Sequence, residues 1–186
     1  MNLTKLFEMQ RVLDQRIMDK HPELKGQDNL EWKVLALQVE LGECANEWRG
    51  FKKWSNDQEP RTAWKQPSYR GGYIERNLVL EEYVDCLHFV LSIGIELKIE
   101  NTQYMDDDEH LTNSIEQDFL NNMGSLKHVY DSHVLKFDIS DIQEYYRDLL
   151  FHFFRLGDRL GFTWEQIEQA YFNKNKVNHE RQESGY

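Results

Sequence analysis

Two stretches of this 186-residue chain combine apolar residues at helical spacing with a pair of acids three positions apart. The pairs are Glu40 with Glu43, and Glu82 with Asp85. Residues three apart on a helix project to one side, so two such helices facing each other would bring four carboxylates to one point. A carboxylate removed from water without a partner is costly or becomes neutral. We therefore expect divalent cations between the two helices.

The four acids are oxygen ligands, and oxygen ligands suit Mg²⁺, with Mn²⁺ as a substitute. Because Mg²⁺ usually completes its shell with water and substrate phosphates, the sequence predicts a phosphorylated substrate. Glu47 follows Glu40 by seven residues and falls near the same face, as a reserve ligand or as an acceptor behind the ligands.

The acids are also compatible with two different arrangements. They could lie on exposed helix faces and pair with Lys or Arg at four-residue spacing. Asp85 and His88 could instead belong to a carboxylate-bridged di-iron bundle, although these helices offer only one acid-x-x-His motif. His88 is accounted for more simply as a packed or hydrogen-bonded helix residue.

The rest of the chain also favours helices, with only three prolines and ten glycines. Helices are predicted over residues 3–20, 28–51, 74–97, 113–133, 140 to 157 or 161, and 163–177, with Asn113, Ser140 and Thr163 as caps. Residues 52–73 are predicted to be a long loop, and the acidic run 106–109 a solvated turn. We predict an all-α bundle of five to six helices with a four-helix metal-binding core. Residues 1–186 would form a single domain, in which 99–139 are an inserted cap, a dimer contact or a partner surface.

Composition excludes several classes of protein. The net charge of −11 argues against binding to nucleic acid or to an anionic membrane. No apolar run approaches the roughly 18 residues of a membrane span, and the N-terminus lacks the order of a secretory signal. We expect a cytoplasmic protein in which Cys44 and Cys86 are reduced packing residues.

The acidic pairs, the second embedded in EEYVDCLHF, resemble those of the all-α nucleoside triphosphate pyrophosphatases, a MazG-like superfamily. Within it the chain resembles the dimeric dUTPases. The segment LFEMQRVLDQRI is similar to the family's first helix, in which a glutamine reads the base; here that residue would be Gln10. The segment WRGFKKW is similar to the aromatic and basic stretch that follows the first acidic pair in this family. Lys174, Asn178 and Arg181 match a Lys-x-x-x-Asn-x-x-Arg pattern that grips the phosphates and sugar. The resemblance covers residues 3–54, 74–98 and 140–183.

The resemblance implies a homodimer that hydrolyses dUTP, and also dUDP, to dUMP with Mg²⁺, releasing pyrophosphate from dUTP. Glu43 would be both a metal ligand and the base that orients the attacking water, beside Glu40, Glu82 and Asp85 as principal ligands. Lys174 and Arg181, seven apart on one helical face, would complete the phosphate clamp.

At the base end, Gln10 could pair with uracil because its amide both donates and accepts. Trp54 is a candidate for stacking on the base, whereas Trp48 is expected in the core. Leu13 occupies a position where some family members carry a base-reading asparagine.

Three points stay open at this stage. The interval between the acidic pairs is longer than is usual in the superfamily, so Arg61, Lys65 and Arg70 have no counterpart. The substrate could be another nucleotide, such as dCTP or one with a damaged base. The chain could also be a non-catalytic helical protein that captures a regulatory protein partner, and that role could coexist with catalysis.

Overall fold

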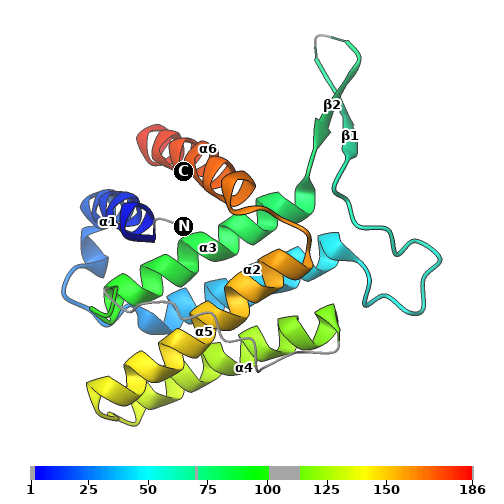
Figure 1. The fold of residues 1–186 in the computed structure, drawn as a ribbon. Helices are drawn as coiled ribbons and strands as arrows, with labels where there is room; N and C mark the ends of the chain where they lie inside the picture. The colour runs from blue at the N-terminus through cyan, green and yellow to red at the C-terminus, as the bar shows by residue number, and fades with distance from the viewer. Residues whose placement is uncertain (1–2, 70, 101–113, 186) are drawn as a thin grey trace.

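The chain folds as a bundle of helices with one small hairpin (Figure 1). The computed structural model describes residues 3–69, 71–100 and 114–185. Within these ranges lie six α-helices: α1 (Leu3–Lys20), α2 (Leu30–Trp48), α3 (Leu78–Glu96), α4 (Ile115–Val134), α5 (Ile139–Arg159) and α6 (Trp164–Ser184). A short 3₁₀ helix, η1 (Pro22–Leu24), connects α1 to α2. The predicted all-α bundle is confirmed.

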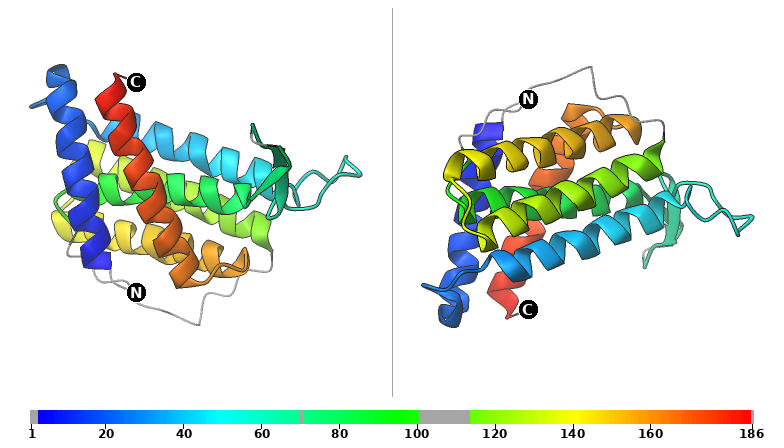
Figure 2. Two further views of the ribbon diagram at one scale, coloured as in Figure 1. Left: turned by 90° about the horizontal axis from the view of Figure 1, so that it is seen from above. Right: turned by 90° about the horizontal axis from the view of Figure 1, so that it is seen from below.

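The helices form a four-helix core with a pair of helices laid across it (Figure 2). In the core, α2 packs antiparallel to α3, and α4 packs antiparallel to α5. The remaining helices, α1 and α6, lie side by side and run in the same direction across α3. Residues from opposite ends of the sequence therefore meet over the helix that carries the second acidic pair.

One continuous apolar core joins α3 to α5 and holds α3 in a fixed position. The buried Tyr83 hydroxyl donates a hydrogen bond to the Phe153 carbonyl over 3.0 Å, and the two rings stack with centroids 4.4 Å apart. A Cβ at Gly157 would lie 2.5 Å from the Tyr83 hydroxyl, so this helix position must be glycine. Tyr83 follows Glu82 directly, and its anchoring fixes the helix turn that presents the acids.

The helix ends agree with the sequence in part. Thr163 caps α6 through the predicted capping box with Gln166. The helix α5 begins earlier than predicted, with Asp138 and not Ser140 at its N-cap. The predicted cap Asn113 lies outside the described residues, and Ser114 caps α4.

The last helix is longer than predicted because tertiary contacts stabilise its polar end. It continues to Ser184 and not only to Val177. Arg16 on α1 contacts His179 over 3.1 Å and Glu183 over 2.7 Å, which ties the final turns of α6 to α1.

The predicted loop of residues 52–73 contains a strand that the sequence did not indicate. β1 (Trp64–Pro67) pairs antiparallel with β2 (Tyr73–Arg76), and both strands are exposed throughout. Neither face is buried, so no apolar alternation marks the strands in the sequence. The predicted helix over 74–97 is therefore wrong at its start: α3 begins at Leu78, and Asn77 caps it by accepting from the Leu80 N–H.

One face of α4 packs into the core of this fold. Phe119, Leu126 and Val129 of α4 are buried in the same core as α2 and α5. Cys44 and Cys86 are buried and free, as predicted. The acidic run 106–109 lies outside the described residues, and the division of the chain into a domain with an inserted cap stays a prediction. In the described part of the chain, no helix has the length and apolarity of a membrane span.

Candidate active site

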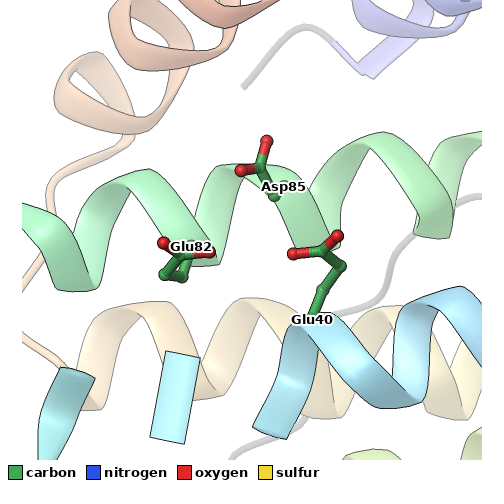
Figure 3. A group of neighbouring side chains, drawn as sticks. All are labelled: Glu40, Glu82 and Asp85. Carbon is green, nitrogen blue, oxygen red and sulfur yellow. The ribbon is translucent and has the colours of Figure 1, made fainter. Parts of the chain in front are cut away.

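Three of the four predicted acids come together between α2 and α3 (Figure 3). Glu40 reaches from α2, while Glu82 and Asp85 project from successive turns of α3. One carboxylate oxygen from each residue lies within 4.8 Å of the others. Three carboxylate oxygens at this separation could share one divalent cation, since oxygen ligands are the ones that Mg²⁺ and Ca²⁺ prefer.

The fourth acid, Glu43, stands beside this cluster and is not part of it. Its side chain is exposed one turn after Glu40 on α2. Its negative charge still contributes to raising the pKa values of Glu40 and Glu82, which places it within electrostatic reach of both. Its predicted roles as ligand and base stay predictions.

The three clustered carboxylates destabilise one another. Burial is the largest cause that raises the pKa of Glu40 to about 7, followed by the charge of Asp85. The same two causes raise the pKa of Glu82 to about 7. Burial also raises the pKa of Asp85, although an ion pair with Lys174 opposes that effect. The negative charge of these acids exceeds the positive charge of the nearby Lys174 and Arg181. A bound divalent cation would neutralise the excess, so the donor set fits a metal ion.

Glu47 lies outside the cluster of three acids and is held in an ion pair, and its role as a reserve ligand or as an acceptor behind the ligands stays a prediction. Arg61 donates to both of its carboxylate oxygens, over 3.1 and 3.0 Å. Backbone hydrogen bonds hold Arg61 at the base of the hairpin, from its own N–H to the Glu47 carbonyl and from the Leu78 N–H to its carbonyl. The loop between the acidic pairs thus fastens the end of α2 to the start of α3.

A cavity of about 360 Å³ opens from the acids towards α1 and α6. It brings together predicted site residues from four helices, and its lining consists of Gln10, Leu13, Asp14, Ile17, Trp32, Glu40, Asp85, His88, Phe89, Ser92, Lys174, Asn178, Arg181 and Gln182. Lys174 and Arg181 also line a second cavity, of about 460 Å³, between α6 and the start of α3. The two cations therefore stand where both cavities meet.

Gln10 lies deep in the first cavity, in a network that the sequence did not predict. Its amide nitrogen donates to Asp14 over 2.7 Å, and its amide oxygen contacts His88 over 2.7 Å and the Tyr171 hydroxyl over 2.9 Å. Asp14 also accepts from Ser92 over 2.6 Å. The four-residue spacing of Gln10 and Asp14 was the available signal, because it places two polar side chains on the inner face of α1.

His88 is a packed, hydrogen-bonded residue, as its sequence context suggested. It is 5% exposed, and its ring stacks on Tyr171 with centroids 4.3 Å apart.

The two tryptophans differ in their surroundings. Trp48 is buried against Phe119, which confirms its place in the core. Trp54 is 78% exposed in the loop after α2, where it contacts Phe51, and it does not line the cavity. Stacking of Trp54 on a base stays a prediction that this cavity does not support.

Comparison with known families gives one match. A family model described as dUTPase matches residues 2–186. The chain belongs to the dUTPase family. As a dUTPase the protein hydrolyses dUTP. The match also spans residues 55–73 and 99–139, which the motif resemblance had left out. No curated protein matches the chain.

Proposed function

We propose that this dUTPase uses Mg²⁺, or Mn²⁺ in its place, to hydrolyse dUTP and dUDP to dUMP, with pyrophosphate as the second product from dUTP. A single observation carries the proposal. Two of the three clustered acids share one cavity with Gln10 and with the Lys174, Asn178 and Arg181 pattern of α6. Anionic ligands for metal, cations for phosphate and an amide for the base are thus gathered around one space.

The order of residues along α3 supports one orientation of the nucleotide. A helix rises about 1.5 Å per residue, so His88 lies about 4.5 Å beyond Asp85 along the axis and Ser92 about 10 Å beyond it. The triphosphate would lie at Glu82 and Asp85, beneath Lys174 and Arg181 of α6. The base would lie one to two turns further along, at Gln10 and Phe89.

Each proposed role follows from the chemistry of the side chain. When bound, Mg²⁺ screens the phosphate charge and activates the attacking water. Lys174 and Arg181 would bind phosphate oxygens, with Arg181 able to donate two parallel hydrogen bonds. Asn178, one turn after Lys174, would donate to the sugar or to a phosphate. Glu43 would accept the proton of the water, because its exposed carboxylate stands beside the cluster.

Substrate profiling tests this proposal. With Mg²⁺ the purified protein should release pyrophosphate from dUTP much faster than from dTTP or dCTP, and phosphate from dUDP. Chelation with EDTA should abolish both activities, and added Mg²⁺ or Mn²⁺ should restore them. Turnover of dUTP that is unchanged in EDTA would refute the metal requirement, and equal rates on the three triphosphates would refute the base specificity.

We further propose a cytoplasmic homodimer that does not bind nucleic acid or membranes. Two apolar residues on the outer face of α2 support an interface between copies: Leu35 and Val39 are 61% and 50% exposed. Sedimentation equilibrium at micromolar concentration should give twice the 22.4 kDa chain mass, and a monomer would contradict the proposal.

A further inference from the structure

Arg61 is held in position by contacts of both its backbone and its side chain. Its N–H donates to the Glu47 carbonyl over 3.1 Å, and its carbonyl accepts from the Leu78 N–H over 2.9 Å. Its Nη1 donates to both carboxylate oxygens of Glu47. The guanidinium carbon also lies 4.7 Å from the centroid of the Trp64 ring, within the range of a cation–π contact. The loop and the first strand of the hairpin therefore direct this cation at Glu47.

Glu47 lies close enough to the cluster of three acids to affect it. It follows Glu40 by seven residues, so the two side chains leave α2 within about 20° of the same direction. Because α2 and α3 are antiparallel, the end of α2 that carries Glu47 lies beside the start of α3 that carries Glu82 (Figure 2). Burial is the largest cause that raises the pKa of Glu82, and the charge of Glu47 is one of the smaller causes. Glu47 therefore stands at the Glu82 end of the proposed metal site.

The ion pair with Arg61 determines whether Glu47 is available to another cation. The Glu47 side chain is 14% exposed and that of Arg61 is 29% exposed, so the pair is partly withdrawn from water. Among the described residues, Arg61 is the one cation within ion-pair distance of Glu47. A carboxylate in such surroundings is costly without a counter-ion, so in the absence of Arg61 a divalent cation at Glu82 would attract it.

We propose that Arg61 determines the metal selectivity of the site by keeping Glu47 away from the metal ion. Ca²⁺ takes about six to eight oxygen ligands in a flexible geometry, whereas Mg²⁺ requires an octahedral shell, keeps several waters and uses one or two carboxylates. A further carboxylate at the Glu82 end would therefore favour Ca²⁺. Arg61 touches neither the nucleotide nor the metal ion and acts through Glu47, as a positioning residue. This inference rests on the proposed use of Mg²⁺.

Calorimetric titrations of the full chain with MgCl₂ and with CaCl₂ test the inference, both in the free protein and with the non-hydrolysable nucleotide α,β-imido-dUTP bound. Arg61→Gln should raise the affinity for Ca²⁺ by about tenfold and that for Mg²⁺ by less than about threefold, because Ca²⁺ accepts the extra ligand more readily. The double variant with Arg61→Gln and Glu47→Gln should return the ratio of the two affinities to the wild-type value. A merely structural role of Arg61 would weaken the binding of both cations and would not be rescued by Glu47→Gln.

Arg76→Gln is the matched control for the change in net charge. Arg76 pairs with Glu81 at the start of α3, in a more exposed ion pair, so this variant removes the same charge without freeing Glu47. Its ratio of Mg²⁺ to Ca²⁺ affinity should equal that of the wild type. An unchanged ratio in Arg61→Gln, an equal fall in Arg76→Gln, or a double variant that keeps the altered ratio would overturn the inference.

The single variant Glu47→Gln keeps the inference testable if Arg61→Gln does not fold. It should bind Mg²⁺ as the wild type does, and a lower affinity would overturn the inference by showing that Glu47 already binds the metal ion. Kinetics give a further measure: at constant Mg²⁺, Ca²⁺ should inhibit dUTP turnover by Arg61→Gln at about tenfold lower concentration than in the wild type.

The outcomes for the wild type separate this inference from the proposed function. A wild-type protein that binds neither cation and hydrolyses dUTP in EDTA would refute the metal requirement, and with it the role of Arg61. A wild-type protein that requires Mg²⁺ but has the same ratio of affinities as Arg61→Gln would refute the role of Arg61 alone.

Discussion

Replacing Glu82 with Gln is expected to lower kcat for dUTP by about a thousandfold and, in the metal-free protein, to raise the melting temperature. The first effect follows because Glu82 is a proposed ligand of the metal ion, and we expect the loss of this ligand to raise the activation free energy by about 4 kcal/mol. At about 1.36 kcal/mol per tenfold change in rate, that increase corresponds to a thousandfold lower kcat. The second follows because burial and the charge of Asp85 disfavour the ionised form of this side chain. Activity and stability should therefore move in opposite directions.

The stability effect should depend on pH in a defined direction. The pKa of Glu82 is raised from 4.5 in the unfolded chain to about 7 in the fold, so folding favours the protonated form. Below about pH 4.5 the carboxyl is protonated in both states and resembles Gln, so the variant and the wild type should melt alike. As the pH rises through 7, Glu82 of the wild type must ionise in the fold, and the free energy of unfolding of the wild type falls. The variant has no carboxyl group at this position and does not lose that stability. His88 and His179, whose pKa values burial lowers, act in the opposite direction but cancel in the difference between the two proteins.

Calorimetry of the metal-free proteins between pH 4 and pH 8, together with steady-state kinetics, measures both effects. Glu31→Gln is the matched control, because Glu31 is exposed near the start of α2 and lies outside the cluster. That control should change neither the turnover nor the pH dependence of melting. A Glu82→Gln protein that melts below the wild type at pH 8 would show that the cluster does not carry the excess negative charge inferred here.

Replacing Glu43 with Gln is expected to lower kcat by about 10² to 10⁴, the usual contribution of a general base. The fold should be spared, because this side chain is exposed and outside the cluster of three acids. The variant tests whether Glu43 acts on the water or holds the metal. As a base alone, its loss should leave Mg²⁺-dependent binding of α,β-imido-dUTP near the wild-type level.

Titration calorimetry with this nucleotide separates the two roles of Glu43. A loss of Mg²⁺-dependent binding comparable to that of Glu82→Gln would make Glu43 a ligand. A kcat within about tenfold of the wild type would remove it from catalysis, since a working base contributes more than that. Glu31→Gln again serves as the control, as a second exposed acid on the same helix.

The helices and their acidic pairs could be read from the sequence because both depend on local spacing. Apolar residues at three-to-four intervals predicted α1 with its observed bounds, and the acids three apart on α2 and α3 pointed to a shared site. The hairpin was missed because its strands are exposed on both faces. The exposure of Leu35 on α2 could not be predicted either, since periodicity shows that a helix has an apolar side but not whether a partner covers it.

The sequence by itself determined the fold class, the family motifs and the identity of the acids, because each of these depends on residues within about two helical turns of one another. Only the tertiary structure decided which groups meet. Gln10 is 78 positions from His88 and 161 positions from Tyr171 in the sequence. Three helices must pack together before the hydrogen bonds among these residues can form. The same packing separates Glu43 from the cluster and pairs Glu47 with Arg61. It also buries His88 against Tyr171, because burial and contact are properties of the assembled chain and not of any segment.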